Sequence, residues 1–478
     1  MLNDDALLNI FYLYELAISE SYSEVFNFPH WADASWWYKP AQVCQRWRYL
    51  IFASPARLGL HLVCTYGTPV ANMLTHSPHL PLIINFLPAD QVRKPSIDDE
   101  ENILLALQYR DRVRRIGLQM PTPDLLKFIK AIDGQFPALE RLFIWPQTQD
   151  DVSLAVTLPT TFQAPHLGML SLSHAALPVG SSLLTTTIGL TSLELSTIPS
   201  SAYFHPSYLI VRISSMPQLE RFTIGFKSSI PTRHVERQPL HTLIEPHVTL
   251  PQLRVLSFRG VSAYLEQLLA RINTPLLEAI QIRLSNQLNF MVPHLSQFMS
   301  RAEDLTGTFS ITRLFFYREA VFLAMDSLEG GRFTPFHVTV GCRHIDWQVS
   351  AAAQIFNTLV HVVSVVKRLV IDYEEHDLSS EQHNGINRIQ WRNLLRPFNS
   401  VEALHVPENL IGHLSRSLQL EDGEPPMELL PELKELLYKK EGDPSDTFTP
   451  FINERQIAGR PVTLIHVPSP PATPSRAA

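Results

Sequence analysis

One hydrophobic pattern recurs along most of the chain. An apolar residue is followed by two others, a second apolar residue, one other and a third apolar residue. The last two apolar positions are two residues apart, the period of a β-strand. Seven copies begin at Val113, Leu139, Leu167, Leu190, Leu219, Leu253 and Leu277, and three weaker ones at Val366, Val401 and Leu433. The intervals between the first seven range from 23 residues, Leu167 to Leu190, to 34, Leu219 to Leu253. Such a period predicts a repeat architecture.

The stretches between these copies predict helices. Thr122-Pro123-Asp124 places a capping residue, a helix-compatible proline and an acid before an apolar stripe that ends at Ile132. Ser96 and the acids after it do the same for a helix through Leu107, and Ser262 is expected to cap a helix from Tyr264 to Ile272. Alternating strands and helices require parallel strands, because each helix returns the chain to the same edge of the sheet. Thr306–Leu359 departs from the pattern, with a strand expected at Phe336–Val340 and a helix at Trp347–Leu359.

Two helices are predicted before the repeats. Asn3 and the acids after it suit a helix start, and apolar residues follow at helical spacing from Leu7 to Tyr14. A second helix is expected over Pro40–Phe52, because its apolar residues also recur at helical spacing. Residues 19–34 are polar and aromatic, show no helical or strand periodicity, and are interpreted as an inserted loop.

The residues of these two helices resemble the F-box motif. Leu2-Asn3-Asp4-Asp5-Ala6-Leu7-Leu8-Asn9-Ile10-Phe11 matches its first half, and Val43-Cys44-Gln45-Arg46-Trp47-Arg48-Tyr49-Leu50 its second. Asn3 stands where that family usually has proline, and the insert separates the halves. The resemblance implies docking on a Skp-type adaptor protein and, through it, on a cullin-based ubiquitin ligase. By position it implies these adaptor contacts: Leu7, Leu8, Ile10, Phe11, Val43, Cys44, Trp47 and Leu50.

The repeats resemble leucine-rich repeats. The family's Asn or Cys, three residues after the last apolar position, is present only as Asn409 in the copies examined, so the turn carbonyls need other hydrogen-bond partners. Residues 390–398 and 451–462 resemble the C-terminal repeats of the large F-box families of mushroom-forming fungi. The expected α/β fold is a helical unit at 1–60, an irregular solenoid, or horseshoe, with a parallel strand ladder at 61–465, and a disordered Pro/Ser tail at 466–478. The competing fold, a doubly wound sheet, requires longer apolar runs and a glycine-rich first turn, and the sequence has neither.

Composition narrows the functional classes. Lys and Arg number 39 against 46 Asp and Glu, a net charge of −7, so no cation excess is available for nucleic acid. Three cysteines are too few for a disulfide framework. The first eight residues carry no Lys or Arg, so no secretory signal is expected. No apolar run has membrane-spanning length. We therefore expect an intracellular protein, cytoplasmic or nuclear, without a nucleic-acid or membrane partner.

Motifs for catalysis or cofactor binding are missing from the sequence. There is no phosphate-binding loop, nucleophile elbow or zinc helix. Cys342-Arg343-His344 places a thiol near an imidazole without a third group to orient them, and Glu374-Glu375-His376-Asp377 is interpreted as a solvated acidic loop rather than a cation site. We expect no enzyme activity, no metal and no cofactor.

Three functional hypotheses remain open. The first is a ligase subunit that presents an unknown protein target on the repeats, with these charged residues as candidate contacts: Glu140, Arg141, Glu194, Glu220, Arg221, Arg254 and Glu278. The second is a non-ligase interaction scaffold whose N-terminal helices only cap the solenoid, and it predicts that Leu7, Ile10, Val43 and Trp47 are all buried within the chain. The third, an enzyme, requires a pocket of converging ionisable groups.

Overall fold

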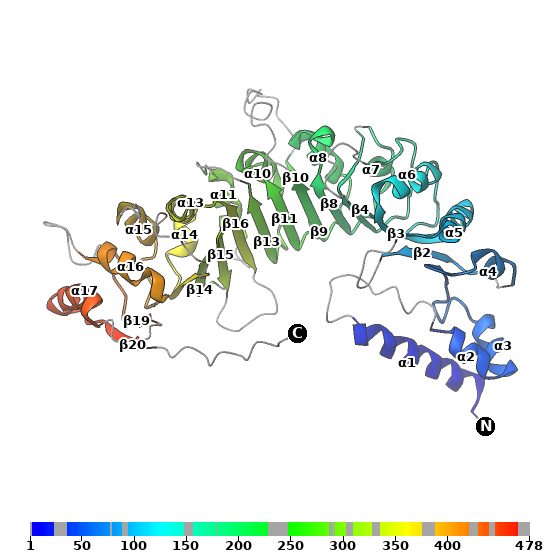
Figure 1. Cartoon of the computed structure of the whole chain (residues 1–478), viewed down its shortest axis with the longest axis horizontal. Coiled ribbons are helices and arrows are strands. Elements are labelled where there is room, and N and C mark those ends of the chain that lie inside the picture. The colour runs from blue at the N-terminus through cyan, green and yellow to red at the C-terminus, as the bar shows by residue number, and fades with distance from the viewer. Residues whose placement is uncertain are drawn as a thin grey trace. The chain divides into compact units, whose positions relative to one another are not determined.

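The computed structural model describes residues 2–22, 36–76, 79–87, 94–147, 156–178, 180–227, 247–285, 290, 292–302, 309–326, 335–374, 388–419, 429–438 and 445–466. These residues form a mixed α/β fold with a large, mostly parallel sheet of 16 strands (Figure 1). The chain divides into two compact units. Unit 1 comprises Met1–Phe204 and Ser215–Leu219, and unit 2 comprises His205–Ser214 and Glu220–Ala478.

Unit 1 begins with helices and continues as alternating strands and helices. Its elements are α1 (Asp4–Tyr22), α2 (Tyr38–Val43), α3 (Gln45–Ala53), β1 (Leu62–Cys64), α4 (Val70–His76), β2 (Leu82–Phe86), α5 (Ile97–Gln108), β3 (Val113–Pro121), α6 (Thr122–Ala131), β4 (Arg141–Gln147), β5 (Val156–Thr157), β6 (Met169–Ser173), β7 (Ala175–Ala176), α7 (Leu183–Thr186), β8 (Ser192–Ile198) and the 3₁₀ helix η1 (Ser200–Ala202). The order β1-β2-β3-β4-β6-β8 follows the chain without the reversal of a doubly wound sheet.

Unit 2 continues the alternation. Its elements are α8 (Pro206–Ile213), β9 (Arg221–Phe226), β10 (Val248–Thr249), β11 (Val255–Gly260), α10 (Ser262–Leu269), β12 (Ile272–Asn273), β13 (Ala279–Leu284), α11 (Pro293–Arg301), β14 (Ile311–Phe316), β15 (Ala320–Asp326), β16 (Phe336–Gly341), α13 (Ile345–Thr358), α14 (Val360–Val363), β17 (Arg368–Tyr373), α15 (Arg388–Leu395), β18 (Ala403–Val406), η3 (Glu408–Leu410), α16 (Ile411–Leu418), β19 (Glu435–Tyr438), α17 (Ser445–Ile457) and β20 (Thr463–His466). Its helices lie along one side of its strands (Figure 1).

The last two apolar positions of all ten copies lie on strands, which confirms the strands predicted there. The strand begins two residues after the first apolar position in nine copies and at that position, Val113, in the tenth. All three apolar positions of every copy are buried. Neighbouring copies pair in parallel with their patterns in register, as where Leu142 of β4 lies opposite Leu170 of β6. Each repeat therefore buries the same three side chains against its own helix and the next repeat.

The part of the chain where the pattern fades contains a local reversal. The predicted strand Phe336–Val340 is confirmed as β16, and the helix expected at Trp347–Leu359 is α13. The sequence did not predict β14 or β15. The strand order here is β13-β16-β15-β14-β17, and β15 is antiparallel to both its neighbours. Because β16 is parallel to β13 and β14 to β17, the ladder resumes in its original direction.

Several predicted boundaries were wrong. The helix expected over Pro40–Phe52 is two helices, because Cys44 is extended at φ −157° and ψ 167° and its Sγ accepts the Trp47 N–H. Residues 19–22 of the expected loop belong to α1, and 23–35 lie outside the described residues. Ser262 is the first residue of α10 rather than its cap, and Ile272 belongs to β12. His466 ends β20, and the rest of the expected tail lies outside the described residues.

Candidate functional site

The two halves of the N-terminal motif contact each other. Asn3 caps α1 as expected, since its Oδ1 accepts the Ala6 N–H at 2.8 Å. The rings of Phe11 on α1 and Trp47 on α3 meet edge to face, with centroids 5.0 Å apart. Arg46 of α3 donates to Asp4 Oδ1 at 2.6 Å and to the Leu2 carbonyl at 2.7 Å. The polar contacts therefore fix the start of α1 on α3 around an aromatic centre.

The eight residues implied as adaptor contacts divide into two groups. Leu7, Leu8, Phe11 and Leu50 are buried within the chain. Ile10 is 45% exposed, Val43 is 62% exposed, Cys44 is exposed and Trp47 is partly exposed. The capping hypothesis predicted burial of Leu7, Ile10, Val43 and Trp47, and this prediction is wrong for Ile10 and Val43. Apolar side chains of both motif halves therefore remain accessible after α1 and α3 have packed.

Further apolar residues of these helices are exposed that were not among the implied adaptor contacts, although Tyr14 belonged to the predicted apolar stripe. Leu13, 62% exposed, and Tyr14, 42% exposed, follow Ile10 at i+3 and i+4, so the three share one face of α1. Tyr49 on α3 is 71% exposed. The helical period of Leu13 was visible in the sequence, but periodicity alone does not distinguish a face buried by the chain from one left to solvent.

Two tryptophans that the sequence analysis did not assign anchor these helices. Trp37 is buried, its Nε1 donates to the His61 carbonyl at 3.0 Å, and it stacks on Tyr38 with ring centroids 4.0 Å apart. The edge of Trp36 lies against Tyr14, with centroids 6.1 Å apart. The adjacent pair Trp36-Trp37 just before Pro40 was the available signal, since such large apolar side chains are rarely left in solvent.

The three cysteines differ in environment. Burial raises the pKa of the Cys64 thiol to about 12 and that of the Cys342 thiol to about 11. Cys342 donates to the Val340 carbonyl, whereas the nearby His344 ring packs against Trp347, with centroids 4.5 Å apart. Neither buried thiol has the lowered pKa of a nucleophile. Cys44, between α2 and α3, is exposed.

The charged residues expected to contact a target have different surroundings. Glu140 pairs with Arg114, Arg254 pairs with Glu278, and Ser171 Oγ donates to Glu194 Oε2 at 2.8 Å. Of the three remaining candidates, Glu220 and Arg221 are exposed and Arg141 is partly buried. Glu140, Arg254, Glu278 and Glu194 therefore already interact with side chains of neighbouring strands, which leaves fewer charged residues for a partner.

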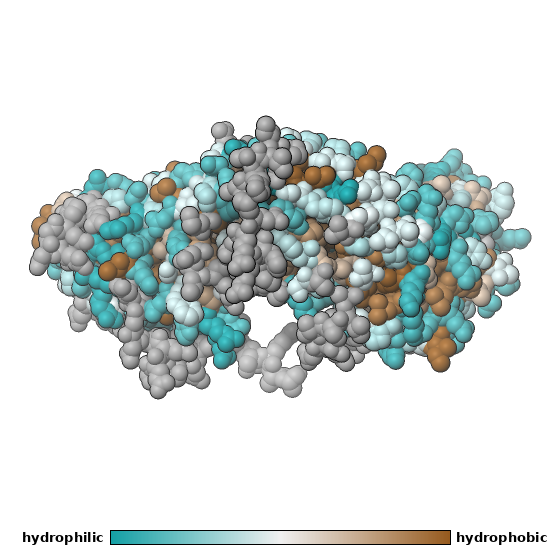
Figure 2. Space-filling model, turned by 90° about the horizontal axis from the view of Figure 1, so that it is seen from above, coloured by the Kyte–Doolittle hydropathy of each residue, from teal (hydrophilic) through white to brown (hydrophobic). Residues whose placement is uncertain are grey.

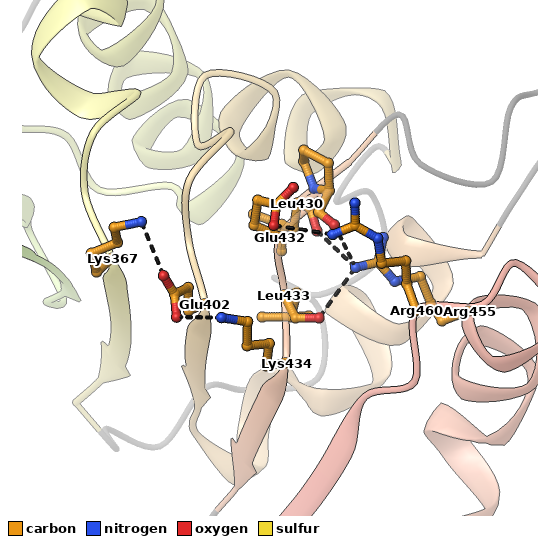
Figure 3. Close-up of polar contacts among 9 residues, drawn as sticks. Lys367, Glu402, Leu430, Glu432, Leu433, Lys434, Arg455 and Arg460 are labelled. Atoms are coloured by element: carbon orange, nitrogen blue, oxygen red, sulfur yellow. Dashed lines mark hydrogen bonds and ion pairs between the residues drawn. The ribbon is translucent and has the colours of Figure 1, made fainter.

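A row of alternating charges joins neighbouring repeats of unit 2. Lys367, Glu402 and Lys434 each stand just before a strand, and both lysines donate to Glu402, at 2.9 and 2.8 Å (Figure 3). These hydrogen bonds, then the positive charges, lower the pKa of Glu402 to about 2. Beneath the side chains, the Glu402 N–H donates to the Lys367 carbonyl and the Lys434 N–H to the Glu402 carbonyl, both at 2.8 Å. The row thus reinforces the strand register.

A buried arginine holds the turn that precedes β19. Arg455 of α17 is 1% exposed, and its Nη2 donates to the carbonyls of Leu430, Pro431 and Leu433 at 3.0 to 3.2 Å (Figure 3). Leu430 has a φ of 48°, a left-handed conformation unusual for leucine. Buried Arg392 likewise donates to the Ser417 and Gln419 carbonyls. Arg455 and Arg392 therefore supply hydrogen-bond donors to carbonyls before β19 and at the end of α16.

No protein-family model and no curated protein matches the sequence.

None of the described helices is both long and apolar enough to cross a membrane. Within the described ranges, no three His, Cys, Asp or Glu side chains gather as metal ligands. The acidic run Glu375–Asp377 lies outside those ranges. On the face shown in Figure 2, hydrophobic residues form separate small groups among hydrophilic and neutral ones.

Proposed function

We propose that the chain is a substrate-recognition subunit of a cullin-based ubiquitin ligase. In this proposal the exposed part of the N-terminal helices binds a Skp-type adaptor, and the repeats present a protein target. Ubiquitin transfer is carried out by other subunits, so the chain itself performs no catalysis.

The exposure of Ile10 and Val43 is the observation that carries this proposal. Both belong to the motif halves, and both stay accessible although α1 and α3 have packed together. Full burial of an exposed aliphatic side chain contributes about 1.5–3 kcal/mol, and Ile10 and Val43, at 45% and 62% exposed, retain about half of that for an interface. Leu7, Leu8, Phe11 and Leu50 then form the internal support of the surface rather than its contacts.

The second candidate is a scaffold without ligase function. Burial of Leu7, Leu8, Phe11 and Leu50 within the chain favours it, because a solenoid end needs an apolar cap. It leaves Ile10, Val43 and Leu13 without a role. The two candidates therefore differ in whether this exposed surface is needed for binding.

Assembly with the cullin tests the ligase proposal. Purified full-length protein is mixed with cullin, with and without the Skp-type adaptor, and captured by a tag on its C-terminal end. We expect the cullin to be captured only when the adaptor is present. Failure of a folded wild-type chain to capture either subunit contradicts the ligase function and favours the scaffold.

A further inference from the structure

The open side of the unit 2 sheet carries two arginines in register. Along β11 and β13, alternate side chains face away from the helices, and Arg259 lies directly opposite Arg283. Neighbouring strands of a sheet are about 4.8 Å apart, so the two side chains start close together. Both are exposed. In the described part of the chain, neither guanidinium group has a hydrogen bond or an ion pair.

The charge of Arg283 acts on its neighbours on both sides. Partial burial, and then the charge of Arg283, lower the pKa of Arg259. His337, one strand further, has its pKa lowered by burial and then by the same Arg283. The carboxylate Asp326 near His337 is already shared with Arg313, at 3.5 Å. Among the described residues no carboxylate pairs with either guanidinium group, and an anion that contacts both would offset their mutual repulsion.

Neutral hydrogen-bonding groups surround the arginines. Ser257 and Gln281 precede them by two positions on the same strands and lie opposite each other, and Thr339 of β16 lies opposite Arg283. These side chains can donate to an anion without adding negative charge.

An aromatic row continues the same face. Phe322 of β15 lies opposite Thr339 and packs against Phe315 of β14, with ring centroids 5.9 Å apart. Tyr317 stacks on Phe315, with centroids 6.3 Å apart. Both phenylalanines are partly exposed. The face thus offers a cationic end and an aromatic end, and Asp372 of β17 lies opposite Phe315 at the aromatic end.

We propose that this face binds an acidic, extended segment of a partner protein, with its anionic side chains on Arg259 and Arg283 and an apolar side chain on Phe315 and Phe322. Charge complementarity selects this occupant, because Arg259 and Arg283 pair with no carboxylate among the described residues. The carboxylate Asp372, which lies opposite Phe315, is four strands away from Arg283. Carboxylates and a phosphorylated serine share the required chemistry. The binding is independent of the adaptor surface, and only the naming of this segment as the ligase target rests on the proposed function.

Fluorescence polarisation of labelled peptides with the full-length protein tests this inference. The probes are one 14-residue extended sequence containing leucine and phenylalanine in three forms, with four glutamates, with a phosphoserine, and with glutamines in place of the acids. Arg259→Gln combined with Arg283→Gln removes the cations, and the exposed Arg301→Gln on α11 is the matched control. Phe322→Ala tests the aromatic end. Circular dichroism and sedimentation check folding and oligomeric state.

We expect an anionic probe to bind, the glutamine form to bind at least 10-fold more weakly, and the double variant to lose at least 10-fold in affinity while Arg301→Gln loses none. Phe322→Ala should weaken binding several-fold. Preference for phosphoserine or for glutamate then identifies the source of the anion, and either supports the inference. No binding of either anionic probe, equal binding by the double variant, or a change of oligomeric state in that variant, which would indicate a second copy on this face, overturns it.

Discussion

Phe11 and Trp47 join two segments that are far apart in the sequence, with their rings edge to face and 5.0 Å between centroids. Phe11 is buried, whereas Trp47 stays partly exposed. The contact therefore links the interior of the helical unit to its surface. A partner that covers Trp47 would rest directly on a packed and supported side chain, which reduces the ordering cost of binding.

Cysteine reactivity reports on this surface. The pKa of Cys64 is raised to about 12 and that of Cys342 to about 11 by burial, whereas Cys44 is exposed. We expect one of the three thiols, Cys44, to react with a maleimide in the native protein and all three in urea. Saturating Skp-type adaptor should slow the reaction of Cys44. Labelling at an unchanged rate in a demonstrated complex places the adaptor elsewhere on the chain.

Arg455 should be essential for stability. Arg455→Met leaves three carbonyls without their buried donor, and we expect the free energy of unfolding to fall by about 3 kcal/mol. Arg460→Met is the matched control, because Arg460 forms an exposed pair with Glu432 worth less than about 1 kcal/mol. Urea unfolding followed by circular dichroism measures both. Equal midpoints for the two variants would show that the turn finds other donors.

His61 should make unit 1 sensitive to acid. Burial, and then the charge of Arg115, lower its pKa from 6.5 to about 4, so the unfolded chain binds a proton more readily than the folded one. Its contribution is therefore present above pH 6.5 and is lost as the pH falls toward 4, by an amount on the order of 3 kcal/mol.

The test compares urea midpoints at pH 7 and pH 4.5. We expect His61→Gln, which cannot be protonated, to lose less stability between these values than the wild type. An equal loss in both proteins would assign the acid sensitivity to other groups.

The row of Lys367, Glu402 and Lys434 should stabilise the fold of unit 2 through ion pairs at the surface. Glu402 bridges two lysines, and its lowered pKa of about 2 means that its contribution is present above pH 4.5 and is lost as the pH falls through 2. Glu402→Gln should lower the melting temperature slightly in 20 mM salt and have no effect in 1 M salt, where screening removes such interactions. A difference that persists in 1 M salt would indicate that packing, not charge, is responsible.

The repeating core was predictable because its signal is local. Each copy of the pattern places three apolar residues at fixed spacing, and the last two, two residues apart, fit a buried strand, as Leu256 and Phe258 of β11 illustrate after the buried Leu253. The antiparallel β15 was not predictable in this way. Its sequence, Ala320–Asp326, is apolar throughout its centre, and such a run does not specify strand direction.

The surface residues were less predictable than the core. Ile10 and Phe11 are neighbours with similar hydrophobicity, yet one is 45% exposed and the other 2%. Which of them is buried depends on where α3 and Trp47 pack, and this is tertiary information. Arg259 and Arg283 were also missed, because they become adjacent only through strand pairing.

Titration calorimetry of the Skp-type adaptor into the full-length protein tests the central claim most directly. The variants are Ile10→Asp with Val43→Asp, and the matched control is Ile188→Asp, since Ile188 is 63% exposed and lies outside the motif. We predict stoichiometric binding by wild type and control, and at least 100-fold weaker binding by the folded double variant. Equal binding by all three proteins, or none by the wild type, would contradict the ligase proposal.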